Sequence, residues 1–169
     1  MKGENAVVHK GFAPVIDDKS VVLILGSFPS VKSRETGFYY GNPSNRFWKT
    51  IAAAVGEDVP NDTEDKKTYL KKHGIALFDV IEESSIKGSS DGDITHKNSK
   101  SADLKSVIAL SDNLRLIICN GKKAFSVFNE VWENCPCPVK YLSSTSAANP
   151  SFKAEEWISE LKNVLKYSE

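Results

Sequence analysis

The sequence has little cysteine and no long apolar run, and both absences narrow the class of protein. Its 169 residues include only three cysteines, an odd number that argues against a disulfide framework and for a reducing compartment. No apolar run approaches the roughly 20 residues that span a bilayer, and no apolar secretory core follows the first residues. We therefore expect a cytoplasmic protein without a membrane partner, built as a single domain over residues 1–169.

Recognisable ligand sets for metals, clusters and nucleotides are also missing. His9, His73 and His96 are too scattered for a zinc motif. Three cysteines cannot supply the four thiolates of an iron–sulfur cluster. Neither a Walker pattern nor a Gly-x-Gly-x-x-Gly fingerprint is present, which disfavours a nucleotide-binding domain built on a phosphate cradle. The sequence thus predicts no metal and no cofactor.

An excess of charge of one sign is missing as well. Lys and Arg total 22, and so do Asp and Glu, so the composition gives no support to nucleic-acid binding. The charge is nevertheless uneven, because residues 31–50 hold four basic side chains, among them Lys32, Arg34 and Arg46, against Glu35 alone. A small domain needs only a few phosphate contacts, so weak and salt-sensitive binding to nucleic acid remains compatible with this balance.

Apolar runs alternate with segments of helical periodicity along the chain. Strands are expected at 21–25, 75–80, 114–119 and 139–142, and helices at 45–55, 63–73, 102–110, 124–132 and around 157–165. Strands separated by helices imply right-handed crossovers. The predicted fold class is α/β, a three-layer α/β/α sandwich with a four-stranded, mainly parallel central sheet. The polar stretch 84–101 is predicted to be a long loop.

Two polar segments follow expected strands. The first runs from Gly26 to Trp48 and the second from Ser143 to Pro150. The carboxyl ends of parallel strands meet at one edge of a sheet, where open α/β folds bind their ligands. We therefore expect both segments to contribute to one site.

The motifs in these segments resemble the uracil-DNA glycosylase superfamily, and within it the branch that removes hypoxanthine and other deaminated bases. Thr36–Tyr40 and Asn42–Trp48 match the Gly-Phe, aromatic and Pro-x-Asn-Arg-Phe-Trp pattern of mismatch-specific uracil glycosylases at the same spacing. Ser144–Asn149 resembles the Ser-Thr-Ser-Pro-Ala-Asn of the hypoxanthine branch, with Ala147 where Pro is commoner. The resemblance covers nearly the whole chain.

The resemblance implies that Asn45 or Asn120 is the catalytic residue that positions the attacking water. Phe28 stands where many relatives have the water-orienting Asp or Asn, and in the hypoxanthine branch the Asn of Asn-Arg-Phe-Trp is thought to assume that role. The residues alone leave a second interpretation open for each asparagine. Asn45 also suits the N-cap of the helix at 45–55, and Asn120 suits an N-cap beside Gly121.

The resemblance also implies a set of base-binding residues. Tyr40 falls where the family stacks an aromatic ring on the extruded base, although a core aromatic is the alternative. Ser30 replaces a bulky Tyr of strict uracil enzymes and leaves room for a purine, and Ser27 and Phe28 belong to the same loop. Asp79 lies near the base-reading amide of uracil enzymes, but the residues alone favour a capping or turn Asp.

By the same resemblance, the last loop pins DNA phosphates while a small apolar side chain fills the emptied base stack. The DNA-binding residues expected from it and from the first segment are Ser33, Arg46, Ser144, Thr145, Ser146, Ala147 and Asn149.

The implied activity is hydrolysis of the N-glycosidic bond of a deaminated base, hypoxanthine first, flipped out of double-stranded DNA in base excision repair. We expect a monofunctional, monomeric enzyme without a cofactor. Two alternatives stay open: a uracil- or mismatch-specific glycosylase, and a non-catalytic DNA- or nucleobase-binding module of the same fold. Phe28 and Ser144 favour the second, because each replaces a polar group that other branches use in catalysis.

Overall fold

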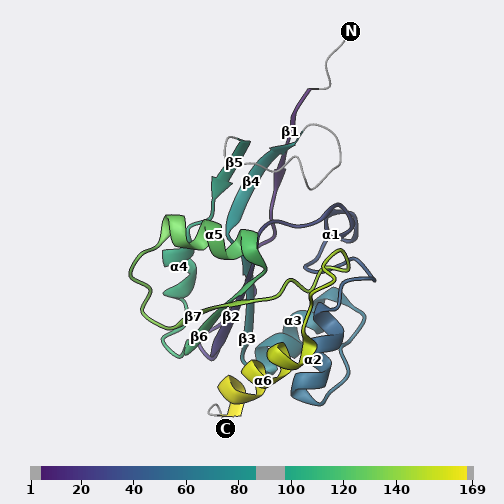
Figure 1. Cartoon of the computed structure of the whole chain (residues 1–169), viewed down its shortest axis with the longest axis vertical. Coiled ribbons are helices and arrows are strands. Elements are labelled where there is room, and N and C mark those ends of the chain that lie inside the picture. Colours follow the sequence, from purple (N-terminus) through teal and green to yellow (C-terminus); the bar gives the residue numbers. More distant parts are fainter. Residues whose placement is uncertain (1–4, 87–97, 167–169) are drawn as a thin grey trace.

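The computed structural model describes residues 5–86 and 98–166 and contains the expected central sheet (Figure 1). Its strands are β2 (Val22–Gly26), β3 (Ile75–Asp79), β6 (Leu116–Asn120) and β7 (Val139–Leu142). They lie in the order β3-β2-β6-β7, and every neighbouring pair is parallel. The predicted four-stranded parallel sheet is thereby confirmed.

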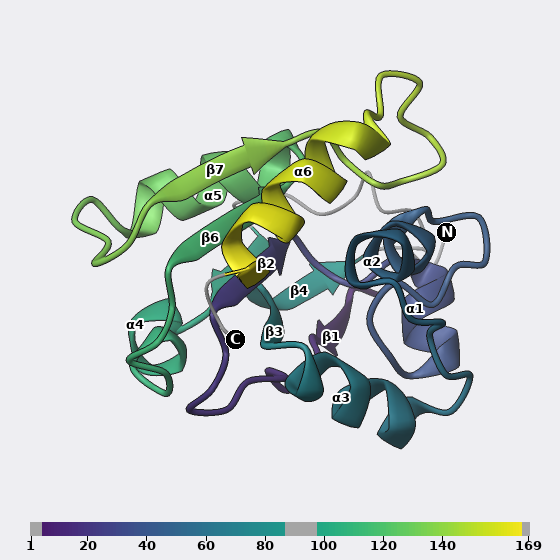
Figure 2. The ribbon, with the colours of Figure 1, turned by 90° about the horizontal axis from the view of Figure 1, so that it is seen from below.

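Helices cover both faces of this sheet and give the three expected layers (Figure 2). The helices are α1 (Val31–Thr36), α2 (Phe47–Val55), α3 (Thr63–Lys72), α4 (Leu104–Ile108), α5 (Lys122–Val131) and α6 (Ala154–Leu165). Strand β2 is buried along its whole length. Its Val22 and Ile24 belong to the core formed with α2, α3 and α6, whereas Leu23 and Leu25 belong to the core formed with α4 and α5.

A second, antiparallel sheet was not expected. It consists of β1 (Val7–Lys10), β4 (Ile81–Ile86) and β5 (Ser99–Ser101), in the order β1-β4-β5. The prediction of a loop from residue 84 onward is therefore wrong at both of its described ends, while residues 87–97 lie outside the described part. Strand β4 buries alternate side chains, so it lacks the continuous apolar run that marked the central strands.

The carboxyl ends of the central strands bring the predicted site together. Gly26 and Asp79 end β2 and β3 as register partners, and Asn120 ends β6 beside Leu142 of β7. The loops that carry both polar segments leave from this edge. In residues 5–86 and 98–166, no helix has the length and apolar character needed to cross a bilayer.

Candidate active site

A cavity of about 240 Å³ opens at this carboxyl edge. Four separate stretches of chain line it, because the ends of β2, β3, β6 and β7 converge there. The lining residues are Phe12, Gly26, Ser27, Phe28, Pro29, Ser30, Ser33, Tyr39, Tyr40, Asn45, Asp79, Asn120, Lys123, Ser144, Thr145 and Ser146. The structure thus gathers both predicted catalytic residues and all the predicted base-binding residues, while Arg46, Ala147 and Asn149 lie outside the cavity.

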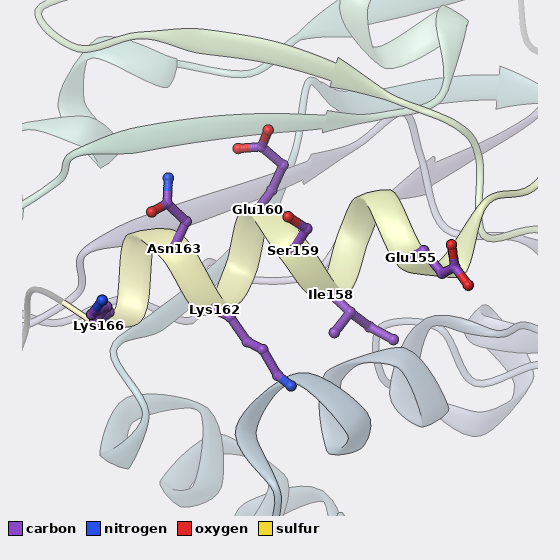
Figure 3. Close-up of a pocket in the computed structure, with 7 residues that line it drawn as sticks. All are labelled: Glu155, Ile158, Ser159, Glu160, Lys162, Asn163 and Lys166. Atoms are coloured by element: carbon purple, nitrogen blue, oxygen red, sulfur yellow. The ribbon is translucent and has the colours of Figure 1, made fainter.

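A larger depression of about 560 Å³ runs along α6, far from these loops in the sequence (Figure 3). Its lining residues all come from α6 and include Ile158, Lys162 and Asn163. Side chains of a single helix surface form no converging set of functional groups. We therefore place the functional site at the carboxyl edge.

Asn120 ties the last loop to the first segment. Its amide nitrogen donates to the Tyr40 hydroxyl at 3.2 Å and to Thr145 Oγ1 at 3.0 Å, and its amide oxygen accepts the Thr145 backbone N–H at 3.0 Å. Gly121, not Asn120, occupies the N-cap of α5. Both amide hydrogens are therefore used within the protein, which suits a positioning role.

Asn45 combines capping with access to the cavity. Its side-chain oxygen accepts the backbone N–H of Phe47 at 2.9 Å, so it caps the first turn of α2, although the helix itself begins two residues later than expected. Within the described part of the chain its amide nitrogen has no hydrogen-bond partner, and the residue lines the cavity. An amide whose oxygen is fixed and whose nitrogen is unused can orient a water molecule.

Tyr40 has one ring face covered and its hydroxyl engaged. Its ring stacks on Phe47 with centroids 3.9 Å apart and planes 21° apart. Burial and the nearby Asp79 raise the pKa of Tyr40, so its phenol stays neutral. Its backbone has a φ of 52°, the left-handed region that non-glycine residues seldom adopt. This backbone conformation and the stacking fix the ring at the cavity wall.

Asp79 is buried, with 6% of its surface exposed. Its Oδ2 has no hydrogen-bond partner among the described residues, and burial raises the pKa of the carboxyl group to about 7. A Cβ atom on Gly26 would lie 2.5 Å from Asp79 Oδ1 and 3.2 Å from the Tyr40 hydroxyl, so glycine is needed there to leave space for both. These contacts do not support the expectation of a capping or turn Asp.

The first loop is folded around its own serines. Ser30 caps α1 by accepting the Ser33 N–H at 3.2 Å. The hydroxyl of Ser33 accepts the Gly41 N–H at 3.0 Å, and the residue is only 3% exposed. Ser33 was expected to contact DNA, but the structure buries it as a support of the loop. Phe28 is buried too, with the Arg34 guanidinium 5.9 Å from its ring centre.

Arg46 fastens the last loop rather than presenting a free cation. Its guanidinium donates to the backbone oxygens of Thr145, Ser146 and Asn149 and lies 4.3 Å from the ring centre of Phe152. The expected direct DNA contact of Arg46 is thus replaced by contacts within the chain.

The last loop separates into buried and exposed residues. Thr145 is 1% exposed, which corrects its expected contact with DNA. Ser144 and Ser146 are partly exposed, Ala147 is exposed, and Asn149 holds the loop by donating to the Ser144 carbonyl at 3.0 Å.

Sequence reasoning missed three residues that line the cavity. Phe12 comes from the segment before β2, where the motif match is weakest, and Tyr39 donates to its carbonyl at 3.2 Å. Lys123 was interpreted as part of a solvated face, yet it lines the cavity from the start of α5. Its position directly after the Asn-Gly at the end of a strand was the available signal.

The cavity therefore offers amides, hydroxyls, an aromatic wall and one buried carboxyl group. Within residues 5–86 and 98–166, no three His, Cys, Asp or Glu side chains come close enough together to hold a metal ion. Such a set suits binding of a planar, polar heterocycle with hydrogen bonds at its edge.

The sequence has close relatives of known class. A sequence model described as the Uracil DNA glycosylase superfamily matches residues 13–166. A hypoxanthine DNA glycosylase from Methanosarcina acetivorans is 35% identical over 155 residues, covering 89% of this chain and 96% of that protein. A hypoxanthine DNA glycosylase from Methanosarcina barkeri is 33% identical over 141 residues, covering 83% of this chain and 87% of that protein.

The fold is matched by a solved structure as well. A solution NMR structure of a candidate uracil DNA glycosylase from Methanosarcina acetivorans aligns with a TM-score of 0.79 at 33% identity, covering 94% of this chain and 99% of that chain. The family match over most of the chain agrees with the motifs around Gly26 and Asn149. This chain belongs to the uracil DNA glycosylase superfamily.

Proposed function

We propose that the chain is a monofunctional DNA glycosylase that hydrolyses the N-glycosidic bond of a deaminated base, hypoxanthine first, flipped out of double-stranded DNA. The observation that carries the proposal is the cavity in which Asn45, Tyr40 and Asp79 converge. The relatives named hypoxanthine DNA glycosylases support the same substrate.

In the proposed reaction the base enters the cavity and stacks on the face of Tyr40 that Phe47 does not cover. Ser30, a small residue in the cavity wall, leaves room for the two rings of a purine. Asn45 orients a water molecule toward C1′ of the sugar. As the glycosidic bond breaks, the base leaves with the bonding electrons, and the water oxygen bonds to C1′ and gives up a proton.

DNA binding in this proposal rests on exposed groups at the rim. Ala147 is the exposed apolar side chain that fills the emptied stack, and Ser144 and Ser146 offer hydroxyls to phosphates. Lys32 is exposed on α1 and adds a positive charge. Asn120 and Arg46 act indirectly, because their hydrogen bonds shape the loop that carries these groups. We propose that a monomer suffices, since one chain contains the whole cavity.

The test uses end-labelled duplexes that carry a single inosine, uracil or adenine at one position. We expect alkali-labile sites with inosine, fewer with uracil and none with adenine, in single-turnover reactions analysed on denaturing gels. A protein that retards the inosine duplex in a native gel without forming alkali-labile sites is a binding module, and the proposal of an enzyme is then wrong.

A further inference from the structure

Asp79 contributes a carboxyl group to the cavity that the protein itself leaves unpaired. The residue is 6% exposed, and Oδ2 has no partner in residues 5–86 and 98–166. Buried polar groups are nearly always hydrogen-bonded, so an orphan that lines a cavity calls for a partner from a ligand. A structural role as a cap would instead use backbone N–H groups close in sequence.

The surroundings of Asp79 favour its neutral form. Gly26 opposite it on β2 brings no charge, and the nearest titratable groups are the phenols of Tyr39 and Tyr40, which interact with the Asp79 charge. The cavity wall adds the Lys123 ammonium from α5. Burial alone accounts for the raised pKa of Asp79, so no neighbouring cation holds the carboxylate ionised.

We propose that Asp79 recognises the flipped base as a neutral carboxylic acid, through two hydrogen bonds to a lactam edge. Its hydroxyl donates to the base carbonyl oxygen while its carbonyl oxygen accepts the adjacent base N–H. The HN–C=O edge is common to hypoxanthine, uracil and xanthine, so Asp79 reads a feature that these bases share, whereas the space beside Ser30 governs ring size. The inference rests on the proposed glycosylase activity.

Ionisation of Asp79 removes this complementarity. A carboxylate offers two acceptors and no donor, so it keeps the bond to the base N–H but places a negative charge against the base carbonyl oxygen. Recognition of a lactam base is therefore lost as Asp79 ionises. The expected signature is a fall in single-turnover rate above about pH 7.

The test compares wild type, Asp79→Asn and Asp79→Ala on inosine and uracil duplexes between about pH 5.5 and 9. Asn copies the donor and acceptor of the neutral acid and does not titrate. We expect Asp79→Asn to cleave without the fall above pH 7. Asp79→Ala should lose roughly 10- to 100-fold on both substrates, the worth of two ordinary hydrogen bonds. Glu133→Gln, an exposed carboxylate outside the cavity, should behave as wild type.

Two results would overturn the inference while leaving the proposed function intact: an unchanged rate for Asp79→Ala, or the wild-type fall with pH in Asp79→Asn. Thermal unfolding checks that each variant folds, and the pH profile of Asp79→Asn decides the matter if Asp79→Ala does not. A wild-type protein that cleaves neither duplex overturns the proposed function and this inference with it.

Discussion

Asn120 and Thr145 hold each other through two hydrogen bonds of 3.0 Å each, although 25 residues separate them in the chain. One bond joins the Asn120 amide nitrogen to the Thr145 hydroxyl, and the other joins the Thr145 N–H to the Asn120 amide oxygen. The end of β6 and the loop after β7 are thereby joined, and the third bond of Asn120, to Tyr40, extends the connection to the first segment.

The first prediction tests this connection by a double-mutant cycle. Asn120→Ala and Thr145→Val should each lower the free energy of unfolding, with a coupling of about 0.5–3 kcal/mol between them, because they share a hydrogen bond. Urea unfolding measures all four proteins. Thr145→Ser keeps the hydroxyl and is the matched control. Strict additivity of the two changes would show that the hydrogen bond contributes nothing to stability.

The second prediction separates the two roles of Asn45. Asn45→Ala should lower the free energy of unfolding by about 0.5–2 kcal/mol through loss of the cap and the single-turnover rate by about 10²- to 10³-fold through loss of water positioning. Asn45→Ser restores an N-cap of similar strength without the amide. We expect it to recover stability but not rate. A fully active Asn45→Ser variant would move water positioning to another group.

The third prediction concerns the space above Gly26. In Gly26→Ala the new Cβ would lie 2.5 Å from Asp79 Oδ1, so the buried carboxyl group must move. We expect a destabilisation of about 1–3 kcal/mol, typical of overpacking, together with slower cleavage. The double variant Gly26→Ala, Asp79→Ala removes the atom that is struck and should regain stability in thermal unfolding. Equal stability of the two variants would place the strain elsewhere.

The fourth prediction is a pH dependence of stability. The pKa of Asp79 is raised from 3.8 to about 7 in the folded protein, so between these values the folded state binds more protons than the unfolded state. Stability therefore falls as pH rises from about 4 to 7 and then levels off. Asp79→Asn should gain stability relative to wild type over that window, by on the order of 4 kcal/mol at its upper end. A difference that stays constant with pH in urea unfolding contradicts the assignment.

The fifth prediction concerns DNA binding at the rim. If Lys32 contacts a phosphate, Lys32→Ala should reduce the slope of log affinity against log salt by about 0.9. Fluorescence anisotropy with an uncleaved duplex measures the slope. Lys162→Ala, an exposed lysine on α6 in the depression of Figure 3, is the matched control and should leave it unchanged. Equal slopes for both variants would place the duplex on another surface.

The central sheet could be predicted because its strands carry near-continuous apolar runs, as in Val22–Gly26. The antiparallel sheet could not be predicted in this way. Ile81–Ile86 mixes apolar and polar residues, and Val7–Lys10 is largely exposed and is held by pairing with a strand more than seventy residues away. Such distant pairing leaves little trace in local composition.

For the site, motif spacing identified residues that the fold brings together, but it did not say which side chains remain available. Ser33 and Thr145 carry hydroxyls suited to phosphates, yet tertiary packing buries both. Arg46 belongs to a DNA-binding motif by resemblance, yet its partners are carbonyl groups about 100 residues away. The orphan state of Asp79 likewise depends on its neighbours from other strands and not on its local sequence.

Because Arg46 holds the carbonyl groups of three residues in the last loop, that loop is already ordered by the chain itself. A preorganised loop loses little conformational freedom when it meets a ligand. The main energetic barrier to engagement then lies in the duplex, in unstacking and unpairing the target nucleotide. Discrimination thus begins before any contact with the base edge, since a weakly paired or mismatched nucleotide reaches the cavity more often than one in a stable pair.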